Sequence, residues 1–145
     1  MFFGFSLYFR RNEMSKVNDF LNEAGLFFLA TVDGDQPKVR PLGFHMNMDG
    51  KELFGVGDFK EVYKQLVANP KTEIVAAKPD GHWLRYTGTV VFETDPKYEA
   101  AALDAMPNLK EIYNEKTGYK MMVFHLEDAT AVVIPVMGPG EDILE

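Results

Sequence analysis

The chain has 145 residues, a hydrophobic content of 46% and a formal net charge of −7 at pH 7. Length and apolar content fit one domain with one core. The acidic charge argues against a nucleic-acid or anionic-membrane surface, because both partners need basic patches. The lack of cysteine excludes disulfides, thiolate metal sites and cysteine nucleophiles, and it is compatible with a cytoplasmic location.

The first 13 residues are apolar, and we interpret them as an N-terminal arm. The segment is too short to span a bilayer, and it lacks the basic start and the small-residue cleavage site of a signal peptide. Its aromatic side chains need to be shielded from solvent, and we expect a second subunit to cover them. They are Phe2, Phe3, Phe5, Tyr8 and Phe9. Residues 14–137 are then expected to form the domain, and residues 138–145 a loose acidic tail.

Apolar periodicity and turn residues predict short strands joined mostly by tight turns. Strands are expected at residues 26–32, 38–45, 52–56, 72–77, 83–93, 119–126 and 129–136. Helices are expected between Ser15 and Gly25 and at residues 59–68, 96–106 and 108–115. Pro41 requires an edge position or a bulge, and Gly88 should let the longest strand bend. Because helices fill so few of the gaps, we predict a mainly β, α+β fold of about six to seven antiparallel strands, closed into a barrel with a few peripheral helices.

The strongest candidate site lies between residues 37 and 66. One strand ends with Arg40, and the next apolar strand is expected to break at Gly55 and Gly57 and to turn directly into a helix. Asp58 and Glu61 have the D-x-x-E spacing of a capping box for that helix.

Two cations in this stretch are candidates for binding one anion. Lys60 falls in the first helical turn, where a cation is unfavourable for the helix dipole unless an anion binds beside the free amides. Arg40 would offer its planar guanidinium to the same anion. Taken singly, each residue is more simply a solvated surface charge; together they favour an anion site.

Other catalytic patterns are not found. The Gly55-Val56-Gly57 stretch has Lys60 in place of the third glycine of the dinucleotide fingerprint. The histidines have no spacing that would make a metal pair, so no metal site is expected. They are His45, His82 and His125. Because no nucleophile elbow or carboxylate pair is found, catalytic residues remain unassigned.

Three stretches together, residues 28–41, 54–66 and 83–88, resemble the pyridoxamine 5′-phosphate oxidase-like, FMN-binding split-barrel superfamily. The most similar type is its short bacterial branch, which includes nitroimidazole-reductase-like proteins. The resemblance covers most of residues 15–135. After Val136 the chain lacks the Arg- and Trp-bearing ending of true pyridoxamine phosphate oxidases, which argues against a vitamin substrate.

The resemblance implies a split β-barrel homodimer with two FMN molecules at the subunit interface, acting as a small oxidoreductase on small-molecule electron donors and acceptors. Arg40 and Lys60 would bind the phosphate. The full set of implied cofactor-binding residues is Val39, Arg40, Pro41, Leu42, Val56, Gly57, Phe59 and Lys60. Asp58 replaces a neutral residue of related chains, so its carboxylate is expected to turn away and cap the helix.

Three alternatives stay open, and one of them is a structural dimer that binds no ligand. The superfamily includes members that bind haem or deazaflavin, and a non-enzymatic flavin carrier or sensor would show the same lack of a catalytic constellation. The barrel interior is expected to be too full for a flavin. The residues expected to fill it are Phe27, Phe28, Phe44, Val90 and Phe92. A cofactor would then lie outside the barrel, against the second subunit.

Overall fold

The computed structural model describes residues 16–144 of the chain. The Ser15 cap and the arm of residues 1–13 lie outside these residues, so both stay predictions. Residues 16–24 are helical and end at Gly25, as predicted. The later helices are α2 (Glu61–Ala68), α3 (Pro96–Ala105) and the short 3-10 helix η1 (Pro107–Glu111). No helix in the described part is long and apolar enough to cross a membrane.

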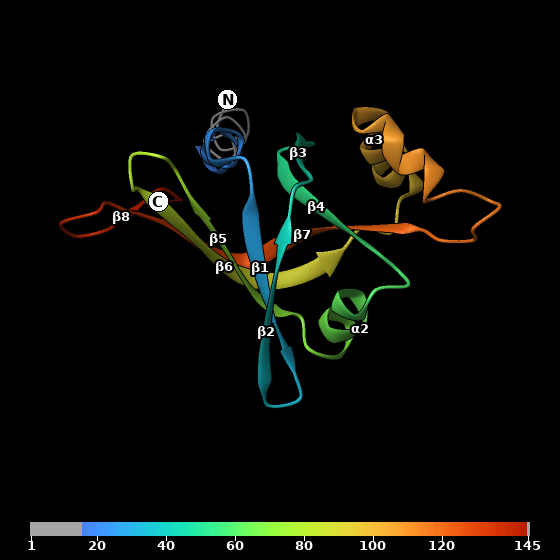
Figure 1. Cartoon of the computed structure of the whole chain (residues 1–145), viewed down its shortest axis with the longest axis horizontal. Helices are drawn as coiled ribbons and strands as arrows, with labels where there is room; N and C mark the ends of the chain where they lie inside the picture. Colours follow the sequence, from blue (N-terminus) through green and yellow to red (C-terminus); the bar gives the residue numbers. More distant parts are fainter. Residues whose placement is uncertain (1–15, 145) are drawn as a thin grey trace, which may run out of the picture.

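The strands form a single antiparallel sheet (Figure 1). They are β1 (Phe27–Asp33), β2 (Gln36–Leu42), β3 (His45–Met48), β4 (Lys51–Gly57), β5 (Lys71–Ala77), β6 (Trp83–Phe92), β7 (Met121–Ile134) and β8 (Glu141–Asp142). Their order is β2-β1-β5-β6-β7-β4-β3, and β8 pairs with β7 off this path. Pro41 therefore lies in an edge strand, as predicted.

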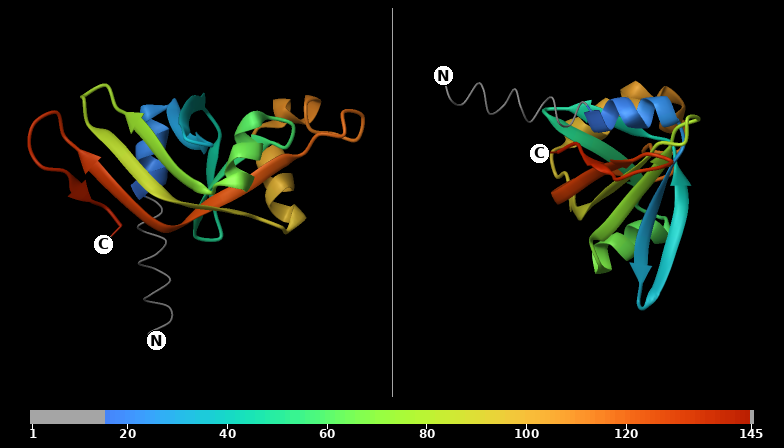
Figure 2. Two further views of the ribbon diagram at one scale, coloured as in Figure 1. Left: turned by 90° about the horizontal axis from the view of Figure 1, so that it is seen from below. Right: turned by 90° about the vertical axis from the view of Figure 1, so that its left-hand side faces the viewer.

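The sheet curls on itself into a half-barrel, and this curvature is visible in Figure 2. Phe27 of β1 and Phe54 of β4 have ring centroids 5.5 Å apart, although β5, β6 and β7 lie between these strands in the sheet. Phe54 in turn contacts Phe124 of β7 at 5.6 Å. This aromatic core confirms the predicted mainly β split barrel.

Strand alternation decides which aromatic residues enter that core. Phe27, Leu29 and Thr31 of β1 are buried, whereas Phe28 points to the other face and is 42% exposed. The expectation that Phe28 fills the barrel is therefore wrong, because successive side chains of a strand point to opposite faces. Phe27 keeps the predicted interior role.

The region between the second and fourth strands was predicted incorrectly. The expected strand 38–45 ends at Leu42, and residues 45–48 form the separate strand β3, which pairs with β4. The two pieces lie at opposite ends of the sheet, β2 against β1 and β3 against β4. A chain that crosses from one end of a curled sheet to the other must leave the ladder, and it does so at Gly43 and Phe44.

The C-terminal strands also differ from the prediction. The two expected strands form one 14-residue strand, β7, that stays paired with β6 on both sides of a register shift at Gly88. Asp128 adopts φ 49° there, so the break expected between residues 126 and 129 is a bulge within one strand. The tail was expected to be loose, but Glu141 and Asp142 pair with Val133 and Val132 of β7.

The segment after β6 forms a second apolar cluster at one end of the sheet. Asp95 caps α3 by accepting a hydrogen bond from the Lys97 amide, and Pro96 occupies its first turn as predicted. Side chains from the ends of β4 and β7 pack against α3 and the segment after it. The cluster comprises Phe44, Leu53, Tyr98, Ala102, Tyr113, Met121 and Val123.

Candidate functional site

A pocket of about 450 Å³ lies where the β2–β3 junction, the end of β4, the start of α2 and the segment after α3 meet. We call it the Arg40–Lys60 pocket. Six of the eight residues predicted to bind a cofactor line it. They are Arg40, Pro41, Leu42, Val56, Gly57 and Lys60. Val39 and Phe59 do not line it; Val39 is 68% exposed in β2, and Phe59 is a partly exposed residue before α2.

Arg40 is held by three neighbours. Its register partner in β1 is Leu29, a core residue, so the side chain points to the inner face of the sheet. The guanidinium donates hydrogen bonds to the Leu29 carbonyl (3.2 Å), the Thr31 hydroxyl (2.8 Å) and the Gln65 side-chain oxygen (2.7 Å). Burial lowers the pKa of Arg40, and an arginine remains charged at neutral pH. Arg40 thus connects β2 with α2 and is fixed at the edge of the pocket.

The start of α2 differs from the predicted capping box. The helix begins at Glu61 with Lys60 as its N-cap, and no side chain caps it. The Asp58 carboxylate instead accepts a hydrogen bond from the Lys120 amide at 3.1 Å, and the Asp58 amide donates to the Lys120 carbonyl at 2.9 Å. The hydrogen bonding between the β4 and β7 chains thus continues one residue beyond β4, to Asp58, and α2 begins only at Glu61. Asp58 does not line the pocket, and its carboxylate does not cap the helix as predicted.

Two glycines of β4 make room for neighbouring side chains, and the strand does not break at them as predicted. A Cβ on Gly55 would overlap the Met121 side chain. A Cβ on Gly57 would lie 2.8 Å from both the Phe59 ring and the Tyr113 hydroxyl oxygen. Contacts this short do not occur in folded proteins, so glycine keeps this wall of the pocket open.

Several lining residues were missed by sequence reasoning. They are Gly43, Phe44, Gly55, Val62, Met106, Leu109, Tyr113 and Met121. Most of these residues are small or apolar. Those after α3 come from a segment whose sequence predicts only a short helix. Because apolar side chains in a helix usually belong to the core, the sequence has no signal that would single them out.

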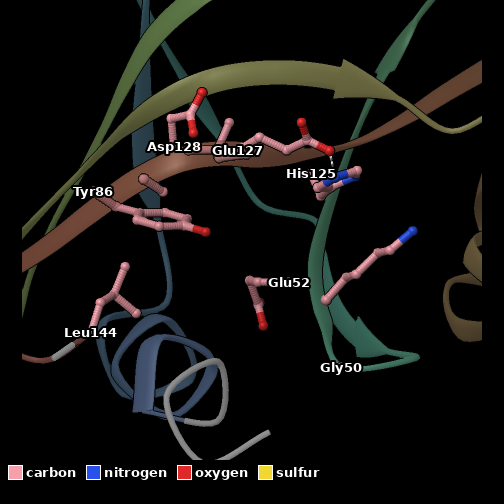
Figure 3. Close-up of a pocket in the computed structure, with 10 residues that line it drawn as sticks. Gly50, Glu52, Tyr86, His125, Glu127, Asp128 and Leu144 are labelled. Atoms are coloured by element: carbon pink, nitrogen blue, oxygen red, sulfur yellow. Dashed lines mark hydrogen bonds and ion pairs between the residues drawn. The ribbon is translucent and has the colours of Figure 1, made fainter. Parts of the chain in front are cut away.

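Charge distinguishes this pocket from the larger cavity in the described structure. The only charged residues that line the Arg40–Lys60 pocket are its two cations. The larger cavity, of about 600 Å³, combines Lys51 with the three carboxylates of Glu52, Glu127 and Asp128 (Figure 3). In a protein with net charge −7, the smaller pocket is therefore the better site for an anion.

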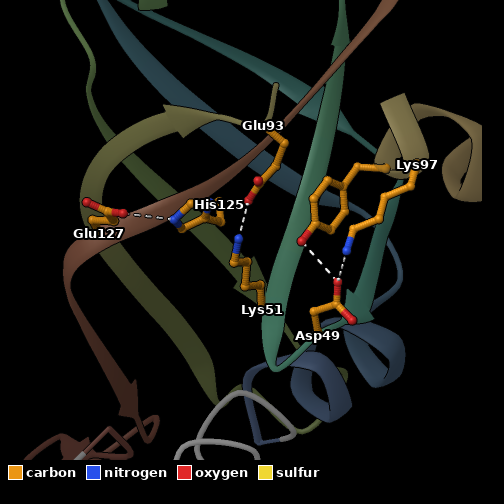
Figure 4. A network of polar contacts seen from close by, with 7 residues as sticks. Asp49, Lys51, Glu93, Lys97, His125 and Glu127 are labelled. Carbon is orange, nitrogen blue, oxygen red and sulfur yellow. Dashed lines mark hydrogen bonds and ion pairs between the residues drawn. The ribbon is translucent and has the colours of Figure 1, made fainter. Parts of the chain in front are cut away.

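The polar groups near the larger cavity are paired with one another (Figure 4). His125 lies between Glu93, at 2.6 Å, and Glu127, at 3.1 Å, and Lys51 also reaches Glu93 at 2.9 Å. His45 similarly contacts the buried Glu52 at 2.6 Å. Within residues 16–144, no group of three or more His, Asp or Glu residues is arranged to hold a metal ion.

Comparisons with known proteins place the chain in a family. The family profile described as pyridoxamine 5′-phosphate oxidase matches residues 14–132. The solved structure of a NimC/NimA family protein from Clostridium acetobutylicum is 32% identical, with a TM-score of 0.85 over 94% of both chains. Among curated proteins, no match to the chain is found.

Two more distant structures share the fold. A heme binding protein from Mycobacterium smegmatis is 16% identical with a TM-score of 0.66, covering 92% of this chain and 57% of that chain. A FAD-binding protein from Mesorhizobium loti is 14% identical with a TM-score of 0.58, covering 83% of this chain and 94% of that chain. The profile and the NimC/NimA structure confirm the resemblance seen in the sequence: this chain belongs to the pyridoxamine 5′-phosphate oxidase-like split-barrel family.

Proposed function

We propose that the chain binds FMN in the Arg40–Lys60 pocket and acts as a small flavin-dependent oxidoreductase. The observation that carries this proposal is the charge of the pocket, which contains two cations and no carboxylate in an acidic protein. Its volume of about 450 Å³ lies within the usual range of small-molecule sites, roughly 300–1,000 Å³. Membership of the family supports a flavin as the ligand.

The phosphate would bind at the start of α2. Lys60 supplies an ammonium group there, and the helix lacks a side-chain cap, so its first amides are available to an anion. Arg40 is already fixed by Leu29, Thr31 and Gln65, so little conformational entropy is lost when its remaining N–H groups bind.

The ring system would lie against the apolar part of the pocket. Phe44, Met106, Leu109 and Met121 line that part, and thioether side chains adapt well to aromatic ligands. Bound FMN supplies the redox chemistry itself, so the chain need only hold the cofactor, shield one face and leave the other open to small-molecule electron donors and acceptors. A pocket without an acid–base pair is adequate for these tasks.

We further propose that the active species is a homodimer. The outer face of β1, β2 and β5 carries Phe28 opposite Pro41 and Val75, and Ala30 opposite Val39. Phe28 is 42% and Val39 68% exposed, so this face presents apolar side chains to solvent. Pro41 also lines the Arg40–Lys60 pocket, so a second copy packed on this outer face would border the cofactor.

The test is a titration of flavin-free protein with FMN and with riboflavin, followed by flavin fluorescence. We expect FMN to bind at micromolar concentration or below with its fluorescence quenched, and riboflavin, which lacks the phosphate, to bind much more weakly. Failure of FMN to bind would overturn the proposal. Turnover of a reduced nicotinamide with an electron acceptor by the loaded protein then separates an oxidoreductase from a flavin carrier.

A further inference from the structure

Tyr113 has a nearly buried side chain with an unused hydrogen-bond donor. It is 8% exposed and lines the Arg40–Lys60 pocket. Its ring lies near Phe59, with centroids 6.4 Å apart. Within residues 16–144, the Tyr113 hydroxyl makes no hydrogen bond. The hydroxyl is therefore free to donate a hydrogen bond to a ligand in the pocket.

The hydroxyl lies beside the turn that opens α2. Its oxygen is 2.8 Å from the position that a Cβ on Gly57 would take. The Gly57 carbonyl accepts a hydrogen bond from the Lys60 amide at 3.1 Å, so Gly57 and Lys60 belong to the same turn. The Tyr113 hydroxyl therefore lies near the end of the pocket where we propose that the phosphate binds.

The hydroxyl keeps its proton at neutral pH. Burial raises the pKa of Tyr113 above its ordinary value, and the nearby negative charge of Asp58 raises it further. The Asp58 carboxylate accepts its hydrogen bond from the Lys120 amide, not from Tyr113. The tyrosine thus offers a donor to an anion placed between it and Lys60.

We propose that the Tyr113 hydroxyl donates a hydrogen bond to the phosphate of bound FMN, completing a site formed by Arg40 and Lys60. This role rests on the proposed function. Hydrogen bonds to charged acceptors are stronger than those between neutral groups, and a phosphate in this turn has the unfilled acceptor positions that the hydroxyl requires. Tyr113 would make the pocket select the phosphorylated flavin over riboflavin.

The test compares Tyr113→Phe with a matched control, Tyr119→Phe, in titrations of flavin-free protein with FMN and riboflavin. Tyr119 is stacked on Phe59 with centroids 4.1 Å apart, but it does not line the pocket. We expect Tyr113→Phe to weaken FMN binding about 10- to 100-fold and to leave riboflavin binding unchanged. Tyr119→Phe should change neither. Melting of both flavin-free variants should match the wild type, because each substitution keeps the ring.

The possible results separate this role from the proposed function. Equal weakening of FMN and riboflavin by Tyr113→Phe would overturn the phosphate contact and assign the hydroxyl to the ring system. Unchanged FMN binding would overturn the role altogether, while the wild-type titration still supported the FMN site. A wild-type protein that binds no FMN would overturn both.

Discussion

Arg40 and Lys60 line the same pocket but are held very differently, and this difference separates their contributions. The Lys60 side chain is exposed, and its ammonium nitrogen lies 6.0 Å from the centroid of the Phe59 ring. Arg40 makes three hydrogen bonds to Leu29, Thr31 and Gln65. Arg40 thus connects β2 to α2, whereas Lys60 has no comparable structural contact among the described residues.

Substitution of these two residues should therefore have unequal effects on stability. We expect Lys60→Ala and Arg40→Ala each to weaken FMN binding by ~1.5–3 kcal/mol, the range for hydrogen bonds to charged groups. Only Arg40→Ala should lower the melting temperature of the flavin-free protein, because it removes the hydrogen bonds to the Leu29 carbonyl, the Thr31 hydroxyl and the Gln65 side-chain oxygen. Flavin titrations and thermal melts measure both effects. If Lys60→Ala weakened riboflavin as much as FMN, the phosphate would be bound elsewhere.

At the scale of elements, the β3–β4 hairpin contains a buried glutamate in contact with a histidine, and this glutamate makes stability depend on pH. Glu52 of β4 has a fully buried side chain that contacts His45 at 2.6 Å and Asn47 at 3.4 Å. Burial raises the pKa of Glu52, and the hydrogen bond from His45 opposes this shift. The charge of Asp19, on the helix of residues 16–24, raises the pKa further.

The direction of this pH dependence follows from the raised pKa of Glu52. The folded protein holds the Glu52 proton more tightly than the unfolded chain, so the stability from Glu52 is fully present below about pH 4.3 and is lost as pH rises through the folded pKa. Glu52→Gln does not titrate. We therefore expect its stability relative to wild type to increase from pH 4.5 to pH 7.5 in urea unfolding. The control is Glu127→Gln, which replaces an exposed glutamate that also contacts a histidine. If the difference in unfolding free energy between Glu52→Gln and wild type did not change with pH, this expectation would be contradicted.

The elements that the sequence predicted well are those with local signals. Gly25 ends a helix, Asp95 and Pro96 begin one, and Gly88 marks the bend of β6, all of which depend on backbone chemistry within a few residues. The capping box at Asp58 failed because Lys120, 62 positions later, competes for the same carboxylate. A hydrogen bond across that separation has no signature in the local sequence.

For the whole molecule, the proposed homodimer makes a prediction about the outer face of the sheet. We expect Val39→Glu to convert the proposed dimer to a monomer, because it places a charge on the apolar outer face of β1, β2 and β5. Val67→Glu is the matched control, since Val67 is 60% exposed on α2, away from this face. Sedimentation velocity over a dilution series measures both. A Val39→Glu protein that stays dimeric would show that the copies meet through another surface.

The site was predictable to the extent that its residues are charged or lie close together in the sequence. Residues 40–42 and 56–60 carry a recognisable pattern, and the fold brings Arg40, Gly57 and Lys60 to one pocket. Tyr113 could not be assigned, because a tyrosine after α3 is as suitable for the core as for a ligand. Its proposed role depends on the position of its hydroxyl, 2.8 Å from where a Cβ on Gly57 would lie, which the packing of α3 and η1 against β4 produces.

The two ends of the sheet determine how copies of this chain can associate. At one end, β2 has proline at positions 37 and 41, which lack amide donors and, in a paired strand, face away from the neighbour. At the other end, β3 has only four residues. Neither end offers the continuous ladder on which another strand could grow. Edge-to-edge association is therefore disfavoured, so the sheet is protected from growing into an open-ended fibre although the outer face of β1, β2 and β5 exposes apolar side chains.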